Sequence, residues 1–226
     1  MTESKILTLW SDGHWNEAEA KRLREPCEEF PLPLDRAARE DIRALMDAFL
    51  ERDDALGLAA PQIGIGRRVI IFKNKHFDEK GRPASDRDYD VLVNPRITQT
   101  RGEPVRGAEG CLSCPDIKVE IERHPEIKVR AYDREGRKIN KRYTGFGARV
   151  VQHEMDHLEG ILIVDHEGTV LVQPDRAPGE HDDPPPVEEH VPANTIVINT
   201  HTEGGMGNDL DIYHDGTHTY IQNGTG

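Results

Sequence analysis

The chain is short of aromatic residues, cysteines and long hydrophobic runs. Phe, Trp and Tyr make up 5% of its 226 residues, so a core must be built mainly from Ile, Val, Leu and Ala. No apolar stretch is long enough to cross a bilayer, and the opening MTESKILTLW lacks a secretory hydrophobic core. Three cysteines are an odd number in a chain without such a signal. They indicate a reducing compartment, the cytoplasm, with thiols kept for chemistry or packing.

Positive charge is also scarce, and the shortage is concentrated in one region. The net charge is −13, with 29 Lys and Arg against 42 Asp and Glu. Eleven of the acidic residues but only one basic residue, Arg176, lie beyond Asp165, which leaves −3 for the first 165 residues. An acidic surface argues against nucleic acid or an anionic membrane as a direct partner, so we expect neither.

Composition divides the chain into three parts. Residues 1–166 mix helical and strand patterns and predict one catalytic domain. Residues 167–194 are acidic, rich in proline and nearly free of apolar residues, which predicts a disordered linker. Residues 195–226 alternate apolar and polar residues, with Asp215-Gly216 in a hairpin-turn position, and predict a short β-prone tail.

The first part contains both helical and strand periodicities. An apolar stripe predicts a helix over residues 36–52, and alternation predicts strands within residues 116–143. Short apolar runs predict further strands at RRVIIF, DVLVNPRI and ILIVDH.

The most informative motif is HEMDH, from His153 to His157. Histidines four positions apart lie on one face of a helix, so both imidazoles can reach one divalent metal. Glu154 stands beside them to handle the proton of a metal-bound water. Apolar residues around the motif follow helical spacing, with Gly145 and Gly160 as boundaries. The alternative is an amphipathic helix whose histidines are ordinary polar residues.

A catalytic metal needs a third protein ligand, and Cys111 in EGCLS is the best candidate because a thiolate binds tightly. Cys114 completes a Cys-x-x-Cys pair, which leaves a redox dithiol or half of a structural zinc site as alternatives. Pro115 and the β pattern after it argue against the redox pair, so we interpret Cys114 as a packing residue. Cys27, without a partner in view, is interpreted as an inert thiol.

A third element is GLAAPQ, residues 57–62. Such a run of small residues more often marks tight packing than catalysis. Beside a metal site, however, the amide of Gln62 could donate a hydrogen bond to an oxyanion. The small-residue backbone could also accept an extended substrate as an added strand.

The three elements occur in the order GLAAPQ, EGCLS and HEMDH, and over roughly residues 23–165 the chain resembles the peptide deformylase family. The resemblance implies an α+β fold, in which small, mainly antiparallel β-sheets surround the helix that carries HEMDH. It implies removal of the N-formyl group from the N-terminal formylmethionine of newly made polypeptides, with release of formate. The implied cofactor is one divalent metal ion, Fe²⁺ first, with Zn²⁺, Ni²⁺ or Co²⁺ as alternatives.

The resemblance also assigns roles to residues. It implies Cys111, His153 and His157 as metal ligands and Glu154 as the general acid/base. The oxyanion on the formyl oxygen would be stabilised by Gln62 and the backbone N–H of Leu112.

Further implied positions surround this centre. Gly57 would present its backbone to the substrate peptide, and the methionine pocket would be lined by Leu56, Phe146 and Val150, which any core could equally use. Glu109 would pair with Arg123, for which the alternative is an ordinary surface ion pair.

Three departures from the family carry expectations of their own. Ala55 stands where the family usually has a glycine, and a left-handed backbone there would be strained by its β-carbon. The C-terminal helix with which many bacterial members contact the ribosome is replaced by the acidic segment, so we expect ribosome contact to be indirect at most. The last residues resemble β-repeats of phage structural proteins, which would place the enzyme in a host cytoplasm.

Two competing functions remain. The chain could be another HExxH hydrolase of the metallopeptidase type, or a catalytically inactive deformylase-like binding module. EGCLS together with GLAAPQ favours the deformylase over the first, and the intact ligand set disfavours the second.

Overall fold

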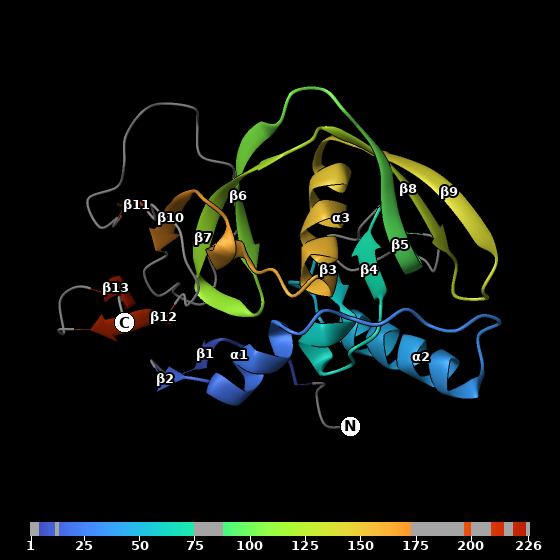
Figure 1. The fold of residues 1–226 in the computed structure, drawn as a ribbon, viewed down its shortest axis with the longest axis horizontal. Coiled ribbons are helices and arrows are strands. Elements are labelled where there is room, and N and C mark those ends of the chain that lie inside the picture. The colour runs from blue at the N-terminus through green and yellow to red at the C-terminus, as the bar shows by residue number, and fades with distance from the viewer. Residues whose placement is uncertain are drawn as a thin grey trace.

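A computed structural model describes residues 5–11, 14–74 and 88–172, together with three short strands at 197–199, 209–214 and 219–224. Two antiparallel sheets dominate the fold (Figure 1). The larger sheet has the strand order β3 (Gly57–Ala59), β4 (Val69–Lys73), β5 (Tyr89–Arg101), β8 (Glu126–Tyr132) and β9 (Lys138–Thr144). The smaller has the order β11 (Val197–Asn199), β10 (Thr169–Val172), β7 (Cys114–Arg123) and β6 (Val105–Cys111).

The remaining elements are helices and two small β-ribbons. The α-helices are α1 (Glu17–Leu23), α2 (Arg36–Leu50) and α3 (Gly145–Leu158), and the 3₁₀ helices are η1 (Ala60–Ile63) and η2 (Ile163–Asp165). The ribbons pair β1 (Trp10–Ser11) with β2 (His14–Trp15), and β12 (Asp209–His214) with β13 (Thr219–Gly224). Within the described ranges, no helix has the length and apolar character that crossing a membrane requires. The predicted α+β fold is confirmed.

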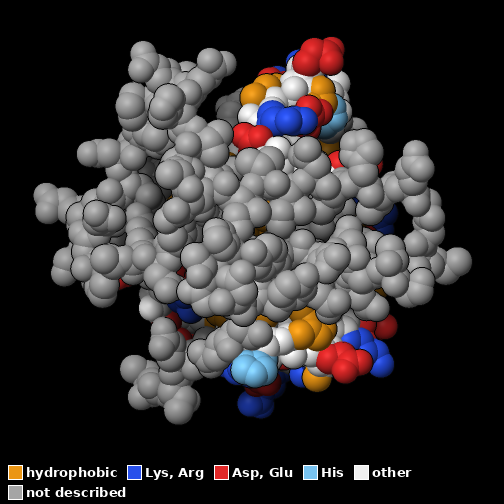
Figure 2. Space-filling model, turned by 90° about the vertical axis from the view of Figure 1, so that its left-hand side faces the viewer, with side chains coloured by type: hydrophobic (Ala, Val, Ile, Leu, Met, Phe, Trp, Pro, Cys, Tyr) orange, Lys and Arg blue, Asp and Glu red, His pale blue; other side chains and the backbone are white. Residues whose placement is uncertain are grey.

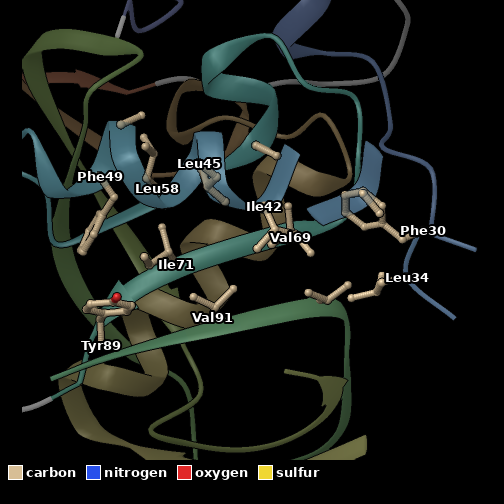
Figure 3. Packing of buried hydrophobic residues seen from close by; sticks show 14 of the residues in the cluster. Phe30, Leu34, Ile42, Leu45, Phe49, Leu58, Val69, Ile71, Tyr89 and Val91 are labelled. Atoms are coloured by element: carbon tan, nitrogen blue, oxygen red, sulfur yellow. The ribbon is translucent and has the colours of Figure 1, made fainter. Parts of the chain in front are cut away.

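Helix α2 covers one face of the larger sheet. It begins where the Asp35 carboxylate caps the chain by accepting a hydrogen bond from Ala38 N at 2.8 Å. Its apolar stripe is buried against strand residues from β3, β4 and β5 (Figure 3). Burying one such Leu, Ile or Phe side chain contributes about 1.5–3 kcal/mol, so this face anchors the helix. The helix predicted for residues 36–52 is confirmed and ends two residues earlier.

Helix α3 packs on the opposite face of the same sheet. On β4, Val69 and Ile71 point into the cluster beneath α2, whereas Ile70 and Phe72 point into the cluster beneath α3. The continuous apolar run VIIF is therefore buried on both faces, as such runs often are. Figure 1 shows α3 held between the two sheets, with β6 and β7 on its other side. This position places the HEMDH helix at the centre of the molecule.

The segment ILIVDH, residues 161–166, does not form the predicted strand. Its middle closes into η2 because the Asp165 carboxylate accepts a hydrogen bond from Leu162 N at 2.8 Å. The same carboxylate binds the Arg24 guanidinium at 2.6 and 2.7 Å. The local pattern of this short apolar run is ambiguous, and a contact with a residue 141 positions away helps to select its conformation.

The start of the predicted linker is ordered. Residues 169–172 form β10, which pairs with β7, so the β structure extends past the expected domain boundary at residue 166. The rest of the linker, residues 173–194, lies outside the described residues, as does the predicted turn at Asp215-Gly216. The tail contains β11, which extends the smaller sheet, and the β12–β13 ribbon.

Candidate active site

Three potential metal ligands meet between α3 and the end of β6. One donor atom each from Cys111, His153 and His157 lies within 4.8 Å of the other two. The Cys111 Sγ atom is 3.3 Å from His157 Nε2. The two imidazoles project from successive turns of α3, with ring centroids 5.2 Å apart. HEMDH therefore lies on a helix, as predicted. Cys111 reaches it from the end of β6, in the smaller sheet.

Cys111 is held by the tight connection between β6 and β7. Cys111 and Cys114 are register partners across this connection, whose Ser113 carbonyl accepts a hydrogen bond from Leu9 N at 2.8 Å. A hydrogen bond from the Cys114 thiol lowers the pKa of Cys111 well below its ordinary value, against the effect of burial and with further help from His157. The thiolate is the form that binds metals. Cys114 is buried, as expected of a packing residue. It also lowers the pKa of Cys111, an effect not predicted from the sequence.

The side-chain amide of Gln62 is fixed in one orientation. Its Oε1 accepts a hydrogen bond from Ala59 N at 2.8 Å, and a backbone donor requires the oxygen there. The Nε2 group therefore faces the other way, donating to Ser113 Oγ at 3.2 Å and lying 3.8 Å from Cys111 Sγ. Gln62 is 2% exposed, so few other orientations are open to it. A hydrogen-bond donor is thus held beside Cys111, as an oxyanion site requires.

Glu154 is buried beside the two histidines and packs directly over Gly57. A β-carbon on Gly57 would collide with the Oε1, Cδ and Cγ atoms of Glu154. Burial raises the pKa of Glu154 to about 7, with contributions in the same direction from Cys111 and Glu109 and opposing ones from the histidines. Its Oε2 atom has no hydrogen-bond partner among the described residues. A carboxyl group in this state can both take and give a proton near neutral pH.

Glu109 organises the polar surroundings of His153. Its carboxylate accepts two hydrogen bonds from Arg123, at 3.0 and 2.9 Å, and lies 3.1 Å from His153 Nδ1. Burial alone would raise the pKa of Glu109, but the hydrogen bonds with His153 and Arg123 lower it to about 2. With Glu109 on Nδ1, the Nε2 atom of His153 is left for a metal. The side chains of Glu109 and Arg123 are 5% and 7% exposed, so the alternative of a surface ion pair is wrong.

Arg149 is a site residue that sequence reasoning missed. Its guanidinium donates to Glu109 Oε1 at 2.7 Å and to the carbonyls of Ile121 and Val105 at 2.9 and 2.6 Å. It therefore joins the edge strand β6 to the carboxylate that faces His153. The position four residues before His153, on the same helical face, is the pattern that could have identified it.

Asp156 forms a second unpredicted link. Its Oδ2 atom accepts a hydrogen bond from Arg123 at 2.6 Å and lies 2.7 Å from His166 Nε2. Burial raises its pKa, but the hydrogen bonds with His166 and Arg123 outweigh this effect and lower it. Asp156 thus links α3 to Arg123 on β7 and to His166 in the segment that follows the helix.

A cavity of about 460 Å³ opens directly onto these groups. Its walls include Gly57, Gln62, Cys111, Leu112 and Glu154, together with the three predicted pocket residues Leu56, Phe146 and Val150. Leu56 and Phe146 are 48% and 63% exposed, so the alternative that they are core residues is wrong. Val150 is buried and also belongs to the core beneath α3.

Ala55 does not carry the expected strain. Among the described non-glycine residues, a positive φ occurs only at Asn94 and Asp116. Ala55 is 1% exposed and packs in the cluster beneath α2. Its methyl group therefore adds apolar contact rather than backbone strain.

The donor set suits a catalytic metal. One thiolate and two imidazoles are ligands that divalent zinc, iron, cobalt and nickel accept, and three protein ligands leave a coordination position open. The hydrogen bond that orients His153 supplies the outer support typical of metal-binding histidines.

Comparisons with known proteins agree with this geometry. The family model described as polypeptide deformylase matches residues 16–172. A peptide deformylase of Desulforudis audaxviator (strain MP104C) is 34% identical over 152 residues, which cover 63% of this chain and 92% of that protein.

Solved structures give the same result. The class I type b peptide deformylase from Acinetobacter baumannii, with Met-Ala-Ser bound, is 32% identical with a TM-score of 0.57, covering 72% of this chain and 98% of that one. A probable peptide deformylase from Synechococcus phage S-SSM7 is 36% identical with a TM-score of 0.57, covering 71% of this chain and 97% of that one.

Proposed function

Because this chain belongs to the peptide deformylase family, an enzyme family that removes N-formyl groups from nascent polypeptides, we propose that the cavity beside Cys111 is its active site. The observation that carries the proposal is the convergence of three ligand atoms with a buried carboxyl group, Glu154, on one cavity. Neither competing function draws support from the relatives.

Cys111, His153 and His157 would hold one divalent metal ion, which we propose to be Fe²⁺. When bound, the ion supplies Lewis-acid chemistry that makes water a strong nucleophile at neutral pH. Glu109 keeps His153 oriented, and Cys114 lowers the pKa of Cys111.

The residues around the ion would carry the remaining chemistry. Glu154 takes the proton of the attacking water and delivers it to the leaving amine, which yields formate and a free N-terminus. The oxyanion that develops on the formyl oxygen accepts hydrogen bonds from Gln62 Nε2 and the backbone N–H of Leu112. Removal of one such donor typically costs about 10²–10³ in kcat.

The cavity also lies between the edges of two sheets. Strand β6 is the edge of the smaller sheet and β3 is the edge of the larger one. We propose that the substrate peptide lies extended along these edges, with Gly57 presenting its backbone. Leu56, Phe146 and Val150 would then contact the methionine side chain. The proposed substrates are N-formylmethionyl nascent peptides in the cytoplasm. We propose that the enzyme reaches them without docking on the ribosome through a C-terminal helix.

The direct test is formate release from formyl-Met-Ala-Ser by the iron-loaded full chain. Glu154→Ala should lower kcat by at least about 10³, because no other carboxyl group in the cavity lies beside both histidines. Glu122→Ala, which removes a half-exposed carboxylate outside the cavity, is the matched control and should retain activity. Cleavage of an internal peptide without formate release, or full activity in Glu154→Ala, would refute the proposal.

A further inference from the structure

The larger sheet has an uncovered face. Helix α2 lies over β3, β4 and the beginning of β5, whereas α3 lies under β8 and β9 on the opposite side. On β8 the inward residues Ile127, Val129 and Ala131 are buried, and the alternate residues Lys128 and Arg130 are exposed. The face of β8 and β9 that α2 does not reach is therefore open to solvent.

This open face carries mainly positive charge. The strand register places Arg96 opposite Arg130, and β9 adds Lys138 opposite Tyr132. Arg96 is paired with Glu29 at 2.5 Å. Within the part of the chain that the structure describes, no carboxylate pairs with Lys128, Arg130 or Lys138. Like charges placed directly opposite on neighbouring strands destabilise a sheet. Glu29 already offsets the charge of Arg96, so Arg130 and Lys138 are the cations that an added anion would neutralise.

A cavity of about 630 Å³ lies among these cations. Arg96, Arg130 and Lys138 line it, and Phe30, Leu32 and Tyr132 form apolar walls. Glu29 is the only carboxylate among the described residues that line it. The wall formed by residues 29–32 is fixed, because Asn94 donates to Phe30 O at 3.0 Å and accepts from Phe30 N at 2.9 Å. The volume falls within the range of small-molecule sites.

We propose that this cavity binds the phosphate group of a nucleotide, either free or within an RNA strand. Arg130 and Lys138 supply positive charge that no described carboxylate neutralises, and arginine matches phosphate oxygens in a two-pronged geometry. Tyr132 and Leu32 offer a surface on which a base can lie, as aromatic side chains do in single-strand recognition. A fully apolar ligand would add no partner for these cations, and the carboxylates of an acidic peptide would bring no base to lie against Tyr132 and Leu32.

The overall acidity of the chain does not oppose this site. Most of the net charge of −13 comes from residues beyond Asp165. A net charge also does not show where the basic residues lie on the surface. Figure 2 shows the opposite end of the molecule, where visible basic and acidic side chains lie side by side. The composition-based expectation of no nucleic-acid contact therefore does not extend to this face.

The site is separate from the proposed active site. On β8, Val129 and Ala131 point toward α3, which carries His153 and His157, whereas Arg130 points to the other face of the sheet. Changes to the outward cations should leave deformylation of a tripeptide intact, so a failure of this proposal is distinguishable from a failure of the proposed function.

The test uses the full chain and a fluorescein-labelled 12-nucleotide uridine RNA, with binding followed by anisotropy against salt concentration. R130E/K138E should raise the Kd at least tenfold and reduce the slope of log K against log salt by about 1.4, as expected for two lost phosphate contacts. The matched control, R39E/R43E, makes the same charge change on the exposed face of α2 and should alter the Kd less than threefold. Both variants should release formate from formyl-Met-Ala-Ser at the rate of the parent chain.

Competition assigns the source of the phosphate. Displacement of the RNA by millimolar AMP but not by inorganic phosphate supports a site for a single nucleotide, and displacement only by unlabelled RNA supports a site for a strand. Absence of binding to both RNA and AMP, or equal weakening in the two variants, would overturn the proposal. If circular dichroism finds R130E/K138E unfolded, R130Q/K138Q is judged by the same criteria.

Discussion

At the scale of single residues, the site depends on side chains that orient other side chains. Glu109 faces His153, Arg149 holds Glu109, and Cys114 hydrogen-bonds Cys111. We propose that their effect is to fix the protonation state and the direction of the metal ligands, which is how outer contacts tune metal sites.

Gly57 provides the sharpest prediction at this scale. Gly57→Ala should lower kcat/KM by about 100-fold, because its β-carbon would displace Glu154 and misplacement of a catalytic group by about 1 Å costs that much. Metal content should be unchanged, since the three heavy atoms nearest the new methyl group all belong to Glu154, which is not a proposed ligand. Gly66→Ala is the control, because a β-carbon there would meet no heavy atom within 4 Å. Activity equal to that of the parent chain in Gly57→Ala would contradict the role assigned to Glu154.

The placement of site residues was predictable from the sequence only where a motif fixes their spacing or their chemistry. His153, Glu154 and His157 follow from helical periodicity, and Cys111 from its chemistry. Arg149 and Asp156 were not identified, because their partners lie on β6, β7 and the segment after α3. Nothing in the local sequence reveals which carbonyl or carboxylate an arginine will meet.

At the scale of elements, long periodic segments were predictable and short apolar ones were not. Helices α2 and α3 were expected from their stripes, and both bury those stripes against the larger sheet. The segment ILIVDH became η2 because of its contact with Arg24. A run of four apolar residues is compatible with either a strand or a buried turn, and only its tertiary contacts distinguish the two.

The contact that selects η2 can be tested by removing its carboxylate. Asp165→Ala should lower the free energy of unfolding by about 2 kcal/mol, because it leaves Leu162 N and the half-buried Arg24 without their acceptor. Urea denaturation measures the change. Glu167→Ala, at an exposed position two residues on, should change the free energy by less than about 0.5 kcal/mol. Equal stability in both variants would mean that the Asp165 carboxylate does not stabilise the fold at η2.

At the scale of the whole molecule, one sheet serves two purposes. The face that packs on α3 positions the HEMDH helix, and the far part of the other face gathers cations around a cavity. Composition predicted the acidic character of the chain but could not locate either surface. Which residues share a face depends on strand register, and register is set by pairing between segments far apart in sequence.

The central claim is that Cys111, His153 and His157 hold the metal of a deformylase site. Its most direct test is the absorption spectrum of the cobalt-substituted full chain, in which a thiolate ligand produces a sulfur-to-metal charge-transfer band. We predict one Co²⁺ per chain and a band that disappears in Cys111→Ala but persists in Cys27→Ala and Cys114→Ala. A band that survives in Cys111→Ala, or is abolished only in Cys114→Ala, would contradict the account.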